Sequence, residues 1–264
     1  TGGMRAYAER SGWMNRMLGL LPATDAKAIA VAQAVPMALR GDRPVSSYAP
    51  TRLPGASPDL MLRVSGLYEG DAQLHPLWEQ AMQTRSLTDD IGGNNGRNGQ
   101  ATGELAAKLL APADGARVMM IEMGGWDTHS AQKGRLGAQL ASLDALIGAL
   151  RKGLGPAWQQ TVVLVATEFG RTVAANGTGG TDHGTASAAM LLGGGVKGGR
   201  VIADWPGLRP GDMVDGRDLK PTVALESFVA GAVAARFGLD PVLTARTLYP
   251  SVSGVKPLSN LLRA

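Results

Sequence analysis

The sequence has no cysteine, few aromatic residues and no apolar run long enough to cross a bilayer. Without cysteine the chain cannot form disulfides, use a thiolate nucleophile or hold zinc or an iron–sulfur cluster through sulfur. Its 3 Phe, 4 Tyr and 5 Trp leave the core to Ala, Leu, Val and Met. A spanning helix needs about 20 consecutive apolar residues. No membrane span is therefore predicted.

The excess of one charge sign is also small. The chain has 26 Lys and Arg against 22 Asp and Glu, a net charge of +4, and its basic residues are scattered. Nucleic-acid-binding proteins gather their basic residues in a patch or stripe, so nucleic acid is not an expected partner. The hydrophobic content of 44% and charged content of 18% are those of a folded chain. We expect one domain over 1–264, irregular and helical over 1–112 and α/β over 113–264.

The first part of the chain is punctuated by proline and glycine. Apolar spacing and turn residues predict a helix over 11–21 capped by Ser11, a buried strand over 28–34, a surface loop over 40–58, one helix over 59–85, a Gly- and Asn-rich loop over 89–103 and a helix over 104–110.

The second part alternates apolar runs with helical patterns. Continuous apolar runs predict buried strands over 116–123, 161–167 and 186–192, and apolar spacing predicts helices over 136–150 and 221–237. Strands that alternate with helices are typical of parallel βαβ units. We therefore predict an α/β fold with a mostly parallel central sheet flanked by helices.

Polar side chains gather in the loops that follow two of these strands. The first loop reads GGWDTH over 124–129, and the second begins EFGRT at 168 and ends TDHG at 184. In open α/β sheets, ligands bind beyond the carboxyl ends of the strands. The two loops supply a candidate metal-binding set and a candidate anion-binding cation: Asp127, His129, Glu168, Asp182 and His183 for the metal, and Arg171 for the anion.

These residue types point to a particular chemistry. Carboxylate oxygens mixed with imidazole nitrogens suit Zn²⁺ or Mn²⁺ better than Mg²⁺ or Ca²⁺. Asp127 and His129 are two residues apart, so their side chains point the same way on extended backbone. A guanidinium such as that of Arg171 can hold a phosphate or sulfate bidentately, which predicts a catalytic role. A metal, an arginine and a carboxylate together equip a site for displacement at a charged ester.

Each motif also has a structural interpretation. His129 can cap a helix or join a hydrogen-bond network. Glu168 and Arg171 can form an ion pair at a strand end, and residues 182–184 can be an ordinary turn.

Taken in order, the motifs resemble the domain-of-unknown-function family 1501 (DUF1501). The blocks span most of the chain: SGWMNR at 11–16, GGWDTH at 124–129, EFGRT at 168–172, TDHG at 181–184 and LGGGVKGG at 192–199. The family is grouped with the alkaline phosphatase and sulfatase superfamily. The resemblance implies an alkaline-phosphatase-like core and a periplasmic or secreted protein.

The resemblance also implies roles for individual residues. One metal ion would take Asp127, His129 and His183, and Glu168 stands where a second metal has its acidic ligand. The sequence departs from the superfamily at two points: Phe169 replaces the histidine that follows that acid, and the Asp-x-His spacing is shorter than the usual Asp-x-x-x-His. The superfamily's nucleophile precedes the region that aligns here. The chain is thus expected to lack the family's N-terminal segment, or to receive it from a second chain.

The residues and the resemblance lead to the expectation of a metal-dependent hydrolase that acts on a small phosphate or sulfate ester. The alternative is a non-catalytic exported scaffold or surface-assembly protein on a degenerate hydrolase fold, which the altered acid–histidine motif favours. An isomerase or phosphotransferase uses similar metals and stays open.

Overall fold

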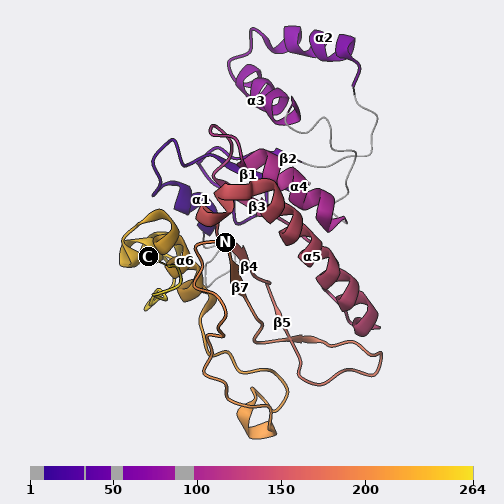
Figure 1. The fold of residues 1–264 in the computed structure, drawn as a ribbon, viewed down its shortest axis with the longest axis vertical. Helices are drawn as coiled ribbons and strands as arrows, with labels where there is room; N and C mark the ends of the chain where they lie inside the picture. Colours follow the sequence, from indigo (N-terminus) through magenta and orange to yellow (C-terminus); the bar gives the residue numbers. More distant parts are fainter. Residues whose placement is uncertain (1–8, 33, 49–55, 87–97, 264) are drawn as a thin grey trace.

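A computed structural model describes residues 9–32, 34–48, 56–86 and 98–263 (Figure 1). Its strands are β1 (Ala28–Val31), β2 (Ser46–Tyr48), β3 (Val118–Ile121), β4 (Val163–Val165), β5 (Gly170–Arg171), β6 (His183–Gly184) and β7 (Met190–Leu192). Its helices are α1 (Trp13–Leu18), α2 (Pro58–Tyr68), α3 (Leu74–Ser86), α4 (Gly99–Leu110), α5 (Gln132–Leu154), α6 (Leu225–Phe237) and α7 (Pro241–Leu248). Short 3₁₀ turns occupy Gly155–Gln160 and Pro210–Asp212.

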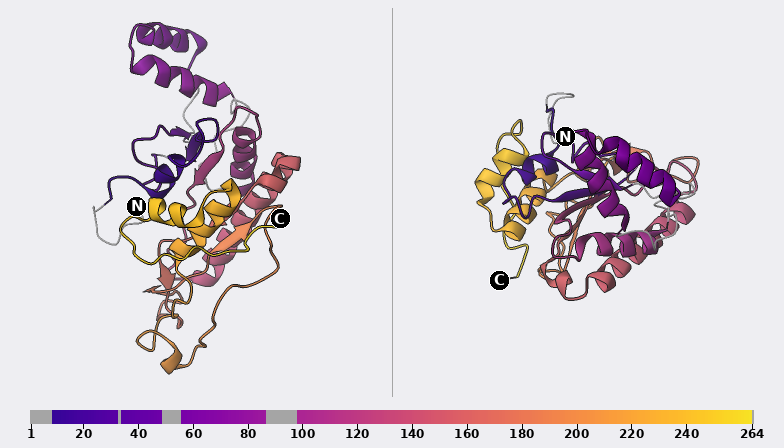
Figure 2. Two further views of the ribbon diagram at one scale, coloured as in Figure 1. Left: turned by 90° about the vertical axis from the view of Figure 1, so that its left-hand side faces the viewer. Right: turned by 90° about the horizontal axis from the view of Figure 1, so that it is seen from above.

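A parallel sheet of order β2-β1-β3 lies at the centre of the fold. Alternate residues of a strand point to opposite faces, and here both faces are covered. Ala28 and Ala30 pack into an apolar cluster with α1, α6 and α7, whereas Ile29 and Val31 pack against Leu105 of α4. Figure 2 shows the resulting layers, with the yellow C-terminal helices on one side of the sheet and the magenta and rose helices on the other. The predicted α/β class and the flanking helices are confirmed.

The central sheet is parallel as predicted, but the later strands do not extend it as further parallel βαβ units and form two separate antiparallel pairs. Strand β7 pairs antiparallel with β4, with Val163 opposite Leu192, and β6 pairs antiparallel with β5, with Arg171 opposite His183. The chain therefore leaves β4, runs outward through β5, and returns through β6 and β7 as a two-stranded ribbon (Figure 1). Apolar runs identify strands but carry no information on direction, which is why the sequence suggested further βαβ units.

Helices α4 and α5 pack closely because small residues line their contact. A Cβ on Gly103 would lie 2.2 Å from the backbone oxygen of Leu146, so only glycine permits this approach. Asn98 caps α4 by accepting a hydrogen bond from the Ala101 N–H. The helix thus begins at Gly99, inside the loop predicted over 89–103, of which residues 89–97 lie outside the described residues.

The first part of the chain differs from expectation at three further points. The single helix predicted over 59–85 is two helices, because the Asp71 carboxylate accepts the N–H groups of Gln73 and Leu74 at 2.8 Å and starts α3 anew. The loop predicted over 40–58 contains β2. Helix α1 is capped at Gly12 without a side-chain bond, rather than by Ser11.

A half-buried arginine joins the N-terminal helix α1 to α7 near the end of the described chain. The Arg16 guanidinium of α1 donates to the carbonyl oxygens of Thr247 and Leu248 at the end of α7, where the last carbonyls of a helix lack partners. Burial lowers the pKa of Arg16, and the nearby Glu9 carboxylate partly offsets this.

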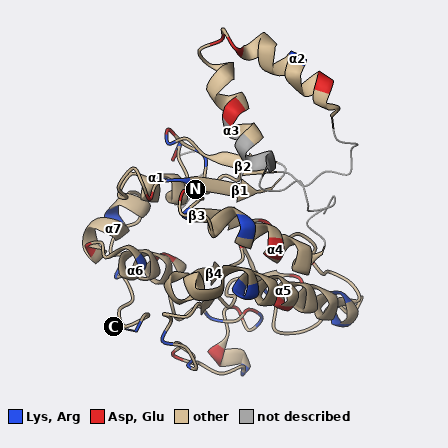
Figure 3. Ribbon diagram, turned by 45° about the horizontal axis from the view of Figure 1, so that its top comes forward, with Lys and Arg blue, Asp and Glu red and all other residues tan. Residues whose placement is uncertain are grey.

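Charged residues of both signs are spread over the described elements. In the view of Figure 3, α4 and α5 each carry Lys or Arg as well as Asp or Glu, and none of the described elements is continuously basic. Among the described helices, none combines the length and the apolar character needed to cross a membrane.

Candidate metal centre

Two loops that are distant in sequence are joined at the start of α5. The first runs from the end of β3 to Gln132 and carries Asp127 and His129. The second lies between β5 and β6 and leads into His183. An antiparallel bridge between Ser130 and Gly179 connects them, and backbone hydrogen bonds from Ala131 to Thr178 and from Gln132 to Gly179 continue it.

The joined loops bring three potential ligand atoms together. Oδ1 of Asp127 lies 3.0 Å from Nε2 of His129 and 2.9 Å from Nε2 of His183. Asp127, His129 and His183 each offer a ligand atom within 4.8 Å of the others. Ligands bound at 2.0–2.1 Å to a tetrahedral zinc lie roughly 3.3 Å apart. One carboxylate oxygen and two imidazole nitrogens at this spacing could therefore hold one metal ion.

These three side chains remain accessible to solvent, with exposed fractions of 48–55%. The hydrogen bond from His183 is the main reason that the pKa of Asp127 lies below its ordinary value, and His129 and Arg171 act in the same direction. The carboxylate is thus held ionised, as a metal ligand must be.

Asp182 contacts the opposite nitrogen of an imidazole in this group. Its Oδ1 lies 3.2 Å from Nδ1 of His129 and accepts a hydrogen bond from the Asn176 amide at 3.1 Å. The Asn176 bond and then the His129 bond lower the pKa of Asp182. A carboxylate on the second nitrogen of a ligating histidine fixes its tautomer and its orientation. The structure places Asp182 in this supporting position and outside the three-residue group.

Arg171 links the two loops across the candidate centre. Its guanidinium donates to the Thr181 carbonyl oxygen at 2.6 Å, and to the Trp126 carbonyl oxygen and Asp127 Oδ1 at 2.8 Å each. Its guanidinium carbon also lies 5.0 Å from the centre of the Phe169 ring, and that ring stacks on His183 at 4.0 Å. The guanidinium is thus rigidly held next to the carboxylate oxygen shared by the two imidazoles.

Glu168 is not brought into this arrangement. It lies after β4 and is exposed to solvent, and its carboxylate does not belong to the group formed by the three ligand atoms. Within the described part of the chain, its side chain has no hydrogen bond or ion pair. Among the described residues, the group that could hold a metal ion is thus Asp127, His129 and His183, without Glu168.

Sequence reasoning missed the polar residues that support the ligands. Oε1 of Gln132 accepts hydrogen bonds from the hydroxyls of Thr128 at 2.9 Å and Thr181 at 2.7 Å. The Asn176 amide and the Thr178 hydroxyl both donate to the His129 carbonyl oxygen. No periodicity or motif spacing signals such bonds, although Thr128 and Thr181 stand next to predicted ligands in the sequence.

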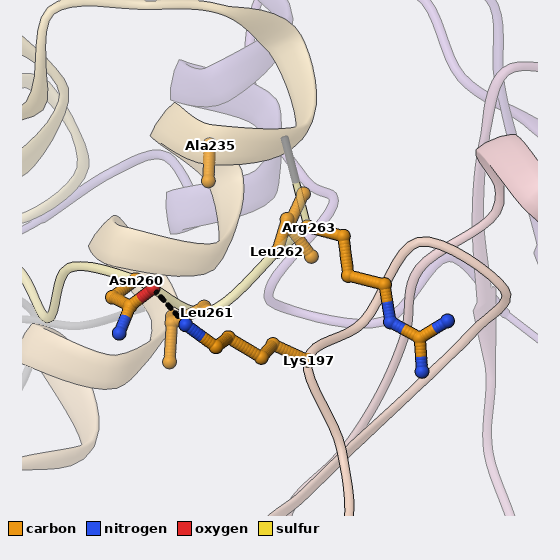
Figure 4. A pocket seen from close by; sticks show the side chains of 6 residues that line it. All are labelled: Lys197, Ala235, Asn260, Leu261, Leu262 and Arg263. Carbon is orange, nitrogen blue, oxygen red and sulfur yellow. Dashed lines mark hydrogen bonds between the residues drawn. The ribbon is translucent and has the colours of Figure 1, made fainter.

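A pocket elsewhere on the surface does not involve these residues. It has a volume of about 540 Å³ and is open to solvent, and its lining is Lys197, Ala235, Asn260, Leu261, Leu262 and Arg263. Figure 4 shows that Lys197 turns toward Asn260, to which its ammonium group donates at 2.8 Å, while the Arg263 guanidinium points away. The lysine is thus already paired within the protein.

Comparison with known proteins identifies the family of the chain. The family described as "Protein of unknown function (DUF1501)" matches residues 1–241, so the chain belongs to this family. The family predicted from the ordered motifs is thereby confirmed. No curated protein and no solved structure is detectably similar to the chain.

Proposed function

We propose that Asp127, His129 and His183 bind one divalent cation, zinc or manganese, and that the protein uses it to hydrolyse a phosphate or sulfate ester. The observation that carries the proposal is the convergence of both Nε2 atoms on Oδ1 of Asp127, at 2.9 and 3.0 Å, from two loops more than fifty residues apart in sequence.

The chain's own residues have distinct parts in this proposal. Bound there, the cation would supply Lewis-acid stabilisation of negative charge on an ester oxygen. Asp182 keeps Nδ1 of His129 engaged, so that Nε2 is directed at the shared centre. Arg171 contributes a positive charge that its bonds to both loops hold in place, and an anionic substrate would be attracted to that charge.

The first experiment measures bound metal and turnover in the same preparations. The purified protein is expected to contain about one zinc or manganese ion per chain and to hydrolyse aryl phosphates or aryl sulfates. Asp127→Ala and His183→Ala remove a ligand and should abolish stoichiometric metal and turnover. His75→Ala is the matched control, because His75 of α3 pairs with Glu79 and lies outside the group. Unchanged metal content in the two ligand variants would refute the assignment.

A second candidate is a non-catalytic exported scaffold that keeps the metal. It is favoured by the position of Glu168, because a single ion without a second acidic site provides less of the machinery for ester displacement. One ion per chain, lost in His183→Ala, with no turnover of either ester class, would support the scaffold over the hydrolase.

A further inference from the structure

Beneath the three candidate ligands, one glutamine connects the loops that carry them. Thr128 stands between Asp127 and His129, and Thr181 precedes His183 by two residues. Both hydroxyls donate to the same oxygen, Oε1 of Gln132. The two threonines are only 3% and 8% exposed, whereas the ligand side chains are about half exposed. The bridge Thr128–Gln132–Thr181 is therefore on the protein side of the candidate centre.

The backbone at Gln132 is itself fixed on both sides. Gln132 is the first residue of α5, and its N–H donates to the Gly179 carbonyl oxygen at 2.9 Å. Ala131 before it has φ = 48°, in the left-handed region that non-glycine residues rarely adopt. The side chain thus extends from a constrained helix start toward two buried hydroxyls, and its oxygen sets the distance between them.

We propose that Gln132 is a positioning residue that sets the separation between the Asp127–His129 loop and the His183 loop, and so determines metal affinity. The inference rests on the proposed metal site. Loss of the Gln132 oxygen leaves two buried O–H donors without an acceptor. The loops must then shift to satisfy these donors, and ligands on separate loops shift relative to one another. Substitution of outer partners of metal ligands commonly weakens binding about 10–100-fold.

The test compares zinc affinities of full-length variants by competition with a chromophoric chelator. Gln132→Met keeps the length of the side chain and removes the acceptor, so zinc affinity is expected to fall about 10–100-fold. Gln132→Glu keeps an oxygen acceptor in the same place and should restore affinity. Gln100→Met is the control, because Gln100 is an exposed glutamine of α4 whose side chain, among the described residues, bonds to Glu104 and not to either ligand loop. The visible spectrum of the Co²⁺-loaded protein should change in Gln132→Met and not in the other two.

A second route keeps the inference testable if Gln132→Met fails to fold. Thr181→Val removes one donor and preserves side-chain shape, and zinc affinity should again fall while the thermal midpoint stays within a few degrees. Zinc affinity and a Co²⁺ spectrum that remain unchanged in either folded variant would overturn the positioning role and leave the metal site intact. Absence of zinc binding by the unsubstituted protein would instead overturn the metal site itself, so the two failures are distinguishable.

Discussion

The apolar cluster around β1 and the two loops of the candidate metal centre are organised by different interactions. In the cluster, Leu18 of α1, Ala30 of β1 and Leu248 of α7 have 0–1% exposure, and α1, α6 and α7 cover one face of the sheet. The ligand-bearing loops bury few apolar side chains. Their order comes from hydrogen bonds made by Arg171, Gln132 and Asn176 to groups on the opposite loop.

The contrast indicates how changes in the two regions should differ in effect. Burial of apolar side chains in the cluster contributes to the free energy of unfolding. Deleting a buried methylene there loses this contribution and leaves a cavity. The loop bonds individually contribute little net stability, but they fix the relative positions of atoms that must meet one ion. Substitutions in the cluster should therefore change stability, and those in the loops should change metal affinity.

The largest expected effect on stability is that of Leu248→Ala. The Leu248 side chain is fully buried at the end of α7, so the substitution should lower the free energy of unfolding by about 2–5 kcal/mol. Leu62→Ala on α2, where the side chain is 74% exposed, should change it by less than about 0.5 kcal/mol. Denaturant titration measures both. A loss of zinc affinity in folded Leu248→Ala would break the distinction between the two regions.

Gly180 in the second loop offers a test of the expectation that substitutions in the loops change metal affinity. A Cβ on Gly180 would lie 2.1 Å from the backbone carbon of His129, so Gly180→Ala must displace one loop from the other. We expect zinc affinity to fall by at least about tenfold, by analogy with changes in outer metal shells. Gly177→Ala is the control, because a Cβ there meets no atom within 4 Å. Equal zinc affinities in the two variants would show that the loops need not stay in register.

A smaller effect on the stability of the fold, limited to acidic pH, is expected from Asp218. Its buried carboxylate accepts hydrogen bonds from Arg217 and Thr185, and chiefly the Arg217 bond lowers its pKa. Because the folded-state pKa lies below the unfolded value of about 3.9, this group stabilises the fold above about pH 4. That contribution is lost as the pH falls through the folded-state pKa.

The corresponding measurement is the free energy of unfolding of the unsubstituted protein and Asp218→Asn between pH 6 and pH 3. The unsubstituted protein should lose more stability over this range than the variant. Parallel pH profiles would indicate that the carboxylate of Asp218 has the same pKa in the folded and unfolded states.

The sequence predicted the cluster better than the loops, for a physical reason. Strands β1, β3, β4 and β7 coincide with apolar runs, and α5 and α6 with helical spacing, because burial imposes a period on the sequence. Asp127, His129 and His183 were expected in loops that follow strands, and the structure brings one ligand atom of each within 4.8 Å of the others. Turns and long-range contacts impose no period on the sequence. They determine the directions in which the strands pair, the break between helices at Asp71 and the short strand β2.

The supporting residues of the site could not be predicted in the same way. Gln132 bonds to Thr181 and Asn176 bonds to His129, 49 and 47 residues away in the sequence, and such long-range bonds leave no repeated pattern. Glu168 shows the converse, because a suitable residue type at a strand end was expected in the centre and lies outside the ligand group.

The most direct test of the shared cation is X-ray absorption at the zinc edge of the loaded protein. We expect two imidazole nitrogens and one carboxylate oxygen at roughly 2.0–2.2 Å, and the loss of one imidazole in His183→Ala. A zinc spectrum without two imidazoles, or one that His183→Ala leaves unchanged, would contradict this expectation.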